Sequence, residues 1–253
     1  MTVTHLRPNM DNWQERVDLA AAFRWTARLN YHEAVANHFS LAVNEDGTRF
    51  LMNPNQSHFS RIKASDIIEI DANNPDTLSG PDAPDPTAWG LHGSLHRNCP
   101  HARCAMHVHS IHATVLASLK DSRLLPIDQN CATFYNRYVI DDNYGGLAFE
   151  DEGERCAAML QDPKKKVMIM GNHGVLVIGE RSLTPSIGSI ILNVPRKLTF
   201  GLCKPDNRCA CFRMKLHQRW LISLKPIRNR TSATLKSSKQ SLTKRAAIIA
   251  SDS

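Results

Sequence analysis

The sequence predicts an α/β fold over residues 1–180, followed by a segment of different character. In the first part, short apolar runs of strand length alternate with stretches whose apolar residues recur at helical spacing, and turn residues separate them. The charge then changes sharply. Residues 1–180 carry 16 Lys and Arg against 22 Asp and Glu, whereas residues 181–253 carry 15 against 2. We therefore interpret the two parts separately.

Each element of the first part follows from its local pattern. A helix is predicted over 13–29, where apolar residues recur at helical spacing after a capping signal. Residues 39–43 and 49–52 predict a hairpin, because they flank the turn-rich segment 44–47. Segment 73–86 is rich in proline and aspartate and predicts an exposed loop. The remaining predicted elements are strands at 67–70, 102–109, 167–170 and 175–178, and helices at 111–119 and 152–161.

Composition excludes several classes of protein. Apolar residues make up 42% and charged residues 22%, which is typical of a globular chain rather than a disordered one. No apolar run reaches the roughly 18 residues of a spanning helix, and the N-terminus lacks the apolar stretch of a secretory signal. The seven cysteines include no CxxC pair, so neither disulfides nor a thiolate zinc site is expected. We expect a cytoplasmic protein with no membrane association.

Three histidines form the candidate metal site. His107 and His109 alternate on a predicted strand, so both imidazoles project from one side. His173 lies between Gly171 and Gly174, which would let the backbone turn tightly at the end of a strand. Three nitrogen ligands with an open position suit a catalytic zinc or a similar divalent ion. The alternative from spacing alone is that the HxH pair consists of two ordinary, half-exposed histidines.

Two segments carry a family resemblance. Residues 99–119, CPHARCAMHVHSIHATVLASL, and residues 167–179, VMIMGNHGVLVIG, resemble the class II aldolase and adducin N-terminal domain family. The resemblance implies a three-layer αβα domain around a central, largely antiparallel sheet. It also implies that His107, His109 and His173 hold Zn²⁺, with Fe²⁺ or Mn²⁺ as alternatives, and that the active site lies between subunits of a cyclic tetramer. The metal of such lyases stabilises an enediolate formed from a small hydroxy-carbonyl substrate.

The sequence identifies the residues of the catalytic acid and base less clearly than those of the metal site. The glutamate that serves as base in fuculose-phosphate-type aldolases aligns with Ala88, which cannot accept a proton. By resemblance, a tyrosine supplied by the neighbouring subunit is expected as proton donor, with Tyr135, Tyr138 and Tyr144 as candidates; the alternative is an ordinary core or interface tyrosine. His92 and His96 share one helix face, and we expect them beside the site or on the surface rather than as ligands. Those two histidines and three tyrosines are the candidates near the site.

The substrate pocket is predicted from one short segment. Residues 36–40, ANHFS, resemble the family's substrate-binding turn, so Asn37 and Ser40 are expected to line the pocket. The alternative is a turn merely capped by these two side chains. Residues 53–56, NPNQ, lack the glycine-containing turn that presents backbone N–H groups to a phosphate. We therefore do not expect a phosphorylated substrate.

The basic segment 181–253 does not continue the resemblance. It shows little helical periodicity, scattered rather than striped basic residues, and three clustered cysteines. Shifting the codon frame near residue 180 allows an amphipathic helix and a Glu-rich helix in its place. We interpret the segment as an out-of-frame, poorly ordered tail. The alternative is a genuine basic arm for nucleic acid or another polyanion.

The sequence thus predicts a metal-dependent, aldolase-like lyase in residues 1–180. Two other functions stay open: a non-haem iron oxygenase on the same fold, and a non-catalytic, adducin-like assembly module, which the alanine at position 88 favours and the retained histidines oppose. The expected partners are a small-molecule substrate and further copies of the chain, if its C-terminal region were intact, and no nucleic acid.

Overall fold

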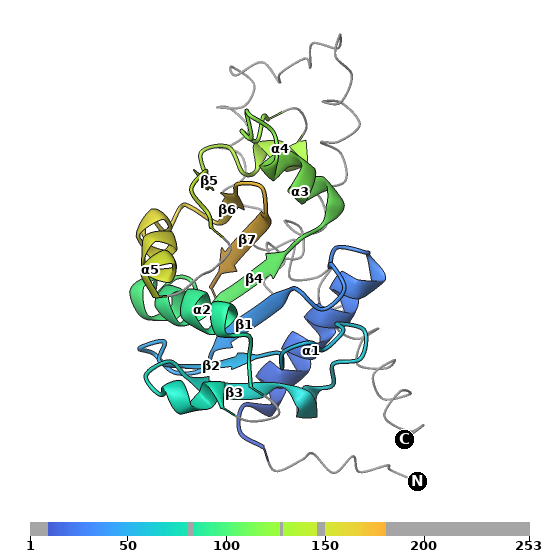
Figure 1. Ribbon diagram of the computed structural model, residues 1–253, viewed down its shortest axis with the longest axis vertical. Helices are drawn as coiled ribbons and strands as arrows, with labels where there is room; N and C mark the ends of the chain where they lie inside the picture. The colour runs from blue at the N-terminus through green and yellow to red at the C-terminus, as the bar shows by residue number, and fades with distance from the viewer. Residues whose placement is uncertain (1–9, 80–82, 127–128, 146–149, 181–253) are drawn as a thin grey trace.

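A seven-stranded sheet forms the centre of the computed structural model, which describes residues 10–79, 83–126, 129–145 and 150–180 (Figure 1). The predicted out-of-frame tail, residues 181–253, lies outside the described residues. The strand order is β3-β2-β1-β4-β7-β6-β5, and all neighbours are antiparallel except β5 and β6. The strands are β1 His38–Ala42, β2 Arg49–Met52, β3 Ile68–Asp71, β4 Cys104–Val108, β5 Tyr138–Asp141, β6 Val167–Met170 and β7 Gly174–Gly179.

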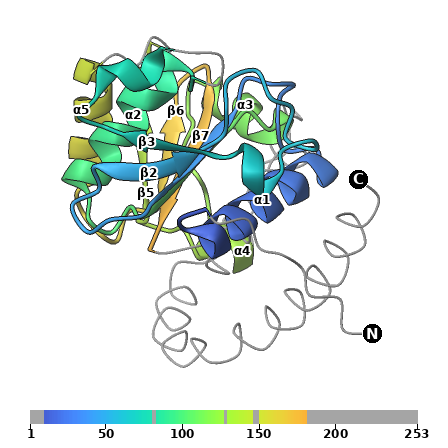
Figure 2. The same ribbon diagram turned by 90° about the horizontal axis from the view of Figure 1, so that it is seen from below.

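Helices cover both faces of this sheet (Figure 2). On one face lie α1, α3 and α4, and on the other lie α2 and α5. The expected three-layer αβα architecture and the largely antiparallel sheet are therefore confirmed. The helices are α1 Trp13–Arg28, α2 Pro86–Asn98, α3 Ile111–Ala117, α4 Gln129–Ala132 and α5 Glu150–Met159, with short 3-10 helices η1 Ala64–Asp66 and η2 Pro75–Leu78.

Alternation along the strands divides the core between the two faces. In β7, Val175 and Val177 join the cluster under α1 and α3, whereas Leu176 and Ile178 join the cluster under α2 and α5. This is the two-residue period that a sheet buried on both faces requires. Every residue of β7 is buried.

All predicted strands and helices are present within two residues of their expected ends, and several further elements are additional, among them α2, α4 and β5. Apart from the helical spacing of His92 and His96, helix α2 was not predicted, because its interior contains two glycines and few apolar positions. Its start nevertheless carries a strong signal, since the Asp85 side chain accepts hydrogen bonds from Thr87 N and Ala88 N while Pro86 occupies the first turn. Strand β5 is four residues long at the edge of the sheet, too short for a clear pattern.

Helices α2 and α5 pack closely through glycine. A Cβ atom on Gly153 would lie 2.7 Å from the carbonyl oxygen of Gly90 and 2.9 Å from Ser94 Oγ. The contact fixes α2 closely against α5, and the histidines of α2 face Ser40 on β1.

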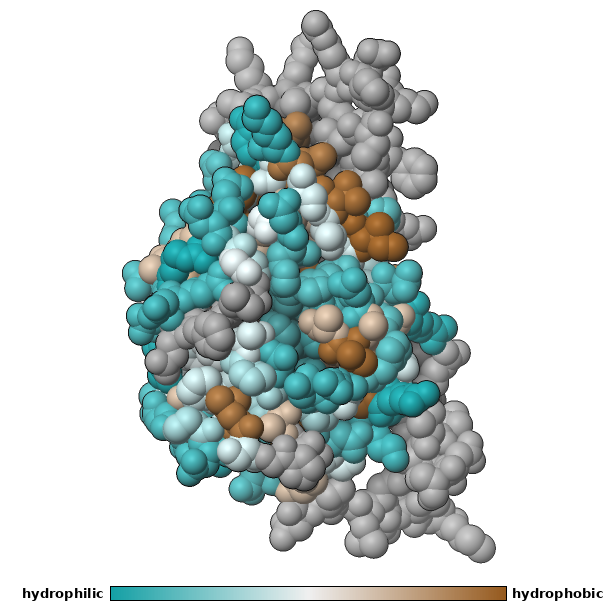
Figure 3. Space-filling view, in the orientation of Figure 1, coloured by the Kyte–Doolittle hydropathy of each residue, from teal (hydrophilic) through white to brown (hydrophobic). Residues whose placement is uncertain are grey.

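The surface carries small apolar areas within a mostly polar face (Figure 3). The described cysteines, Cys99, Cys104, Cys131 and Cys156, are free and buried, in keeping with the expected absence of disulfides in this part of the chain. None of the helices in the described ranges has the length and apolar character needed to cross a membrane.

Candidate metal centre

The antiparallel topology brings the three predicted histidines to one edge of the sheet. Strand β4 ends at Val108, next to the start of β7 at Gly174, because Val108 pairs with Val175. His107 is the penultimate residue of β4, His109 follows the strand, and His173 directly precedes β7. Residues 64 or more positions apart in the chain are therefore neighbours in the fold.

The three imidazoles meet through the same ring atom. The Nε2 atoms lie 2.7 Å apart for His107 and His109, 3.0 Å for His109 and His173, and 3.1 Å for His107 and His173. The rings of His107 and His173 stack, and the His109 ring stands edge-on to both. The HxH pair thus projects both imidazoles from one side, as the alternation of the strand predicts.

Two of the three rings are oriented by acceptors at their other nitrogen. His107 Nδ1 donates to the carbonyl oxygen of Val175 at 3.1 Å, and His109 Nδ1 donates to Glu33 Oε2 at 2.7 Å. Both acceptors lack a hydrogen to give, so each Nδ1 carries the proton. Each Nε2 of the neutral ring then presents a lone pair toward the centre of the group.

This donor set fits a divalent metal ion. Lone pairs facing one another at about 3 Å repel, and a single proton cannot satisfy three such nitrogens at once. A cation bound to all three satisfies them together, and zinc accepts imidazole nitrogens at about 2.0–2.1 Å, which a triangle of this size permits. In the described part of the chain, His107, His109 and His173 are the group of ligand atoms close enough to share one ion.

Burial keeps the ligands in the metal-binding protonation state. Desolvation, followed by the neighbouring His38, lowers the pKa of His107 well below its ordinary value. Desolvation also lowers the pKa of His173, to about 4, with His109 adding to the shift and Glu33 opposing it. Neutral imidazole binds metals whereas imidazolium does not, so these two ligands are available at neutral pH.

The turn that contains His173 is formed in a different way from the one that the sequence predicts. The left-handed residue is Asn172, with a φ of 55°, rather than either flanking glycine. The two glycines instead allow neighbouring backbone segments to approach them closely. A Cβ on Gly174 would lie 2.6 Å from the carbonyl oxygen of Val108 and 2.9 Å from His109 Cδ2. Gly174 therefore lets β7 approach the end of β4 next to His109.

The position of the missing glutamate is apolar. Ala88 is fully buried in the first turn of α2, in a cluster with Phe50, Met52 and Ile70. One and two helical turns later, His92 and His96 are also buried, so neither lies on the surface. Their rings point to β1, where both contact the hydroxyl of Ser40.

The predicted pocket residues occupy different surroundings. Asn37 is buried, and its Oδ1 accepts a hydrogen bond from Glu33 N at 2.6 Å, while its Nδ2 has no partner among the described residues. The Ser40 hydroxyl is occupied by His92 and His96. Asn37 therefore holds the turn that carries Glu33, and its free Nδ2 is a donor.

The three candidate tyrosines are separated by the fold. The Tyr144 ring lies 4.7 Å from the His173 ring, centroid to centroid. Tyr138 begins β5 and packs against the core cluster on the α1 side of the sheet. Tyr135 lies in the turn before β5 and is half-buried. Burial raises the pKa of Tyr144, so its phenol stays protonated at neutral pH.

Sequence reasoning missed two residues at the site. Glu33 holds His109, yet an isolated glutamate in a loop carries no local signal. His38 lies opposite His107 in the β1–β4 register, with ring centroids 4.8 Å apart. The alternation of His38 with Ser40 on β1 was the available signal, since both side chains point to the face covered by α2.

Comparisons with known proteins agree with this fold. The chain is 28% identical over 163 residues to "4-hydroxy-3-prenylphenylpyruvate oxygenase/4-hydroxy-3-prenylbenzoate synthase" of Streptomyces roseochromogenus subsp. oscitans, spanning 64% of this chain and 58% of that relative. An aldolase II superfamily protein from Pseudomonas syringae superposes with a TM-score of 0.75 at 24% identity, covering 95% of this chain and 96% of that one. An L-fuculose 1-phosphate aldolase from Glaciozyma antarctica PI12 superposes with a TM-score of 0.68 at 19% identity, covering 85% and 82%.

A family assignment follows from the sequence itself. Residues 17–184 match the family described as Class II Aldolase and Adducin N-terminal domain, which is more than half of the chain and includes all three clustered histidines. The chain belongs to the class II aldolase and adducin N-terminal domain family.

Proposed function

We propose that the protein is a divalent-metal-dependent lyase of the class II aldolase type, acting on a small hydroxy-carbonyl substrate. The observation that carries this proposal is the convergence of three Nε2 atoms, from His107, His109 and His173, within 3.1 Å of one another. The proposed ion is Zn²⁺, with Fe²⁺ or Mn²⁺ as alternatives, since imidazole suits all three. When bound, the ion supplies Lewis-acid stabilisation of negative charge that develops on the substrate's oxygen atoms.

The chain's own residues have separate roles in this proposal. Glu33 orients His109, and the carbonyl of Val175 orients His107, so that the ligand nitrogens are presented without rearrangement. Tyr144 is the proposed proton donor, because its ring contacts that of His173. Asn37 Nδ2, buried without a partner, is a proposed donor to the substrate.

Metal analysis of the purified full-length protein tests the first step. We expect about one tightly held divalent ion per chain, lost in His173→Gln and retained in His101→Gln, whose ring contacts the carbonyl of Leu160 instead. Aldol cleavage of a panel of hydroxy-ketones and hydroxy-acids, with and without chelator, tests the second. A chain that binds no ion, or cleavage that survives full removal of the metal, would contradict the proposal.

A non-haem iron oxygenase is the second candidate. The relative from Streptomyces roseochromogenus named as an oxygenase favours it. Substrate-dependent oxygen uptake by the iron-loaded protein would distinguish this activity from aldol cleavage by the zinc-loaded protein.

A third candidate, a non-catalytic module as in adducin, is favoured by Ala88 in place of the usual base. It predicts no bound ion and no turnover.

We further propose a cytoplasmic protein that assembles as a tetramer when its C-terminal region is intact, and that does not bind nucleic acid. The out-of-frame interpretation of residues 181–253 stays a hypothesis, supported by the end of the family match at residue 184. The nucleotide sequence tests it, because third codon bases incompatible with the shifted frame would refute it.

A further inference from the structure

A chain of hydrogen bonds runs from the interior of the domain to the edge of the metal centre. His96 Nδ1 lies 2.7 Å from the carbonyl oxygen of Ala102, and His96 Nε2 lies 2.6 Å from Ser40 Oγ. The same hydroxyl contacts His92 Nδ1, and His92 Nε2 lies 2.7 Å from His38 Nδ1. This series of hydrogen bonds links three imidazoles and one hydroxyl group, and it runs from the residues before β4 to the start of β1.

The direction of every bond in this chain follows from its inner end. A carbonyl only accepts, so His96 Nδ1 carries a hydrogen and the Nε2 of the neutral ring accepts the one from Ser40. Ser40 has no second hydrogen, so His92 Nδ1 donates to it, and His92 Nε2 accepts from His38 Nδ1. The last ring, His38, is then left with an unprotonated Nε2.

The rings are neutral because they are buried. His92 and His96 are almost fully buried, and neither forms an ion pair with a carboxylate in the described part of the chain. Burial lowers the pKa of His96 to about 4 and that of His92 well below the ordinary value. Each neutral ring carries one N–H hydrogen, and the bond directions given above need that number.

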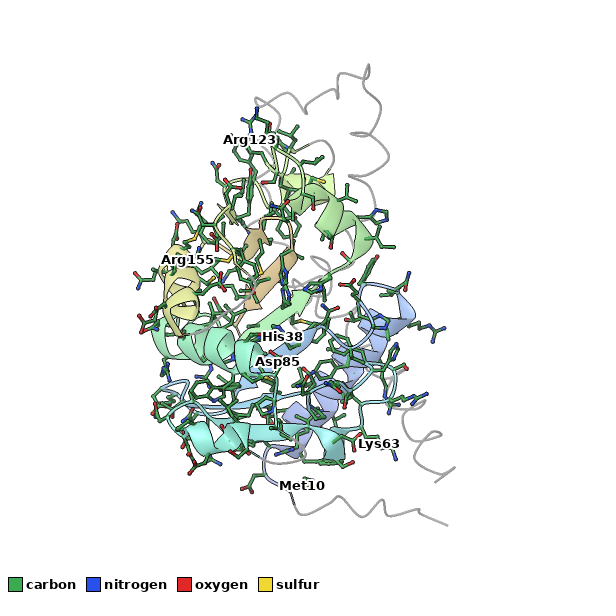
Figure 4. All side chains as sticks on the ribbon, viewed as in Figure 1. Met10, His38, Lys63, Asp85, Arg123 and Arg155 are labelled. Carbon is green, nitrogen blue, oxygen red and sulfur yellow. The ribbon has the colours of Figure 1, made fainter. Side chains whose placement is uncertain are left out.

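His38 borders the metal centre without belonging to the ligand group. It pairs with His107 across β1 and β4, with ring centroids 4.8 Å apart, and it is not one of the three clustered histidines. Figure 4 shows His38 and Asp85 next to each other, beside the start of α2. The Asp85 carboxylate accepts hydrogen bonds from the first turn of α2. The Nδ1 of His38 instead forms its hydrogen bond with His92.

We propose that the His96–Ser40–His92 chain holds His38 as a hydrogen-bond acceptor beside the metal centre, where its Nε2 binds a hydroxyl group of the substrate. This inference rests on the proposed function and deepens it, because it names the group that the substrate presents at this position. A neutral acceptor favours a hydroxyl and disfavours a carboxylate or phosphate oxygen, which has no hydrogen to donate. Aligned bonds that all donate away from the site also polarise one another and strengthen the acceptor at its end.

The first experiment measures the proton positions in the wild-type protein. Full-length, metal-free protein labelled with ¹⁵N-histidine is analysed by long-range ¹H–¹⁵N correlation at pH 7. We expect the hydrogen on Nδ1 in each of His38, His92 and His96. A hydrogen on Nε2 of His38 would overturn the inference, and this result is independent of whether the protein binds metal or catalyses any reaction.

The second experiment measures binding of two zinc ligands, acetohydroxamate and glycolohydroxamate, which differ by one hydroxyl group. In the zinc-loaded protein we expect glycolohydroxamate to bind about three- to tenfold more tightly, the effect of one neutral hydrogen bond. His38→Asn places an amide where Nδ1 lies, so it retains a donor for His92 but lacks the acceptor. We expect this variant to bind zinc as the wild type does and to lose the preference.

The control is His101→Asn, a half-buried histidine whose Nε2 contacts the carbonyl of Leu160 in another part of the domain. It should retain the preference for glycolohydroxamate. A preference that persists in His38→Asn, or that is absent from the wild type, would overturn the inference. Failure of the wild type to take up zinc would instead overturn the proposed function, and the proton positions would still decide the role of His38.

Discussion

The Glu33 carboxylate lies 2.7 Å from His109 Nδ1, although 76 residues separate the two in the chain. Glu33 itself is 63% exposed, whereas the His109 side chain is 11% exposed. The carboxylate thus reaches in from the surface and determines which nitrogen of His109 faces the other two histidines. A carboxylate behind a metal-binding imidazole both orients the ring and increases its basicity.

Glu33→Gln should weaken metal binding without unfolding the protein. The amide can still accept through its oxygen, but the charge that strengthens His109 as a ligand is lost, so we expect about a tenfold loss of zinc affinity. Competition with a chromophoric chelator measures the affinity. Glu45→Gln, an exposed glutamate in the β1–β2 turn, is the matched control and should bind zinc as the wild type does. Equal affinities in the two variants would contradict a role for Glu33.

Gly174→Ala should damage the site and the fold together. The added methyl would lie 2.6 Å from the carbonyl oxygen of Val108, so β4 and β7 must separate at the end that carries the ligands. We expect a loss of about 1–3 kcal/mol in the free energy of unfolding, measured by urea denaturation, and weaker zinc binding. Gly145→Ala is the control, because its added methyl would meet its nearest atom at 3.6 Å. A Gly174 variant as stable as this control would refute the close approach.

The metal-free protein should lose stability as the pH falls from about 6.5 to about 4. Burial lowers the pKa of His96 to about 4, whereas in the unfolded chain it is about 6.5. The unfolded chain therefore binds a proton at this residue in a range where the folded chain does not, and the free energy of unfolding decreases with decreasing pH. The contribution is on the order of 3 kcal/mol and is fully lost below pH 4.

Urea denaturation at pH 7, 5.5 and 4.5, in the presence of chelator, measures this dependence. His96→Gln removes the titrating group, so the stability difference between wild type and variant should shrink as the pH falls. A difference that stays constant over this range would show that His96 titrates alike in the folded and unfolded chains.

Ala88→Glu should destabilise the protein rather than restore a base. The methyl of Ala88 is fully buried among Phe50, Met52 and Ile70, and an ionised carboxylate there would lack a partner. We expect a loss of several kcal/mol in the free energy of unfolding at pH 7, which becomes smaller at low pH as the carboxyl group is protonated. Thr87→Glu, one position earlier in the same turn, is the control. Faster aldol cleavage by a stable Ala88 variant would contradict this prediction.

Local patterns were sufficient for most of the secondary structure and for the placement of His107 and His109. Alternation along the predicted strand 102–109 places His107 and His109 on one side, because the side-chain period of a strand is two residues. Apolar runs bounded by turn residues likewise predicted β2, β6 and β7 nearly to their ends. Helix α2 was missed, since its glycines and histidines hide the helical period.

The sequence alone thus determined the shared side of His107 and His109 and the alternation of helices and strands, since both depend on neighbouring residues. Only the tertiary structure decided that Glu33 contacts His109, that His38 lies opposite His107, and that His92 and His96 share the hydroxyl of Ser40. These contacts depend on strand register and on how α2 packs against the sheet. Register and packing are set by the burial of the whole core, and no short segment of sequence contains that information.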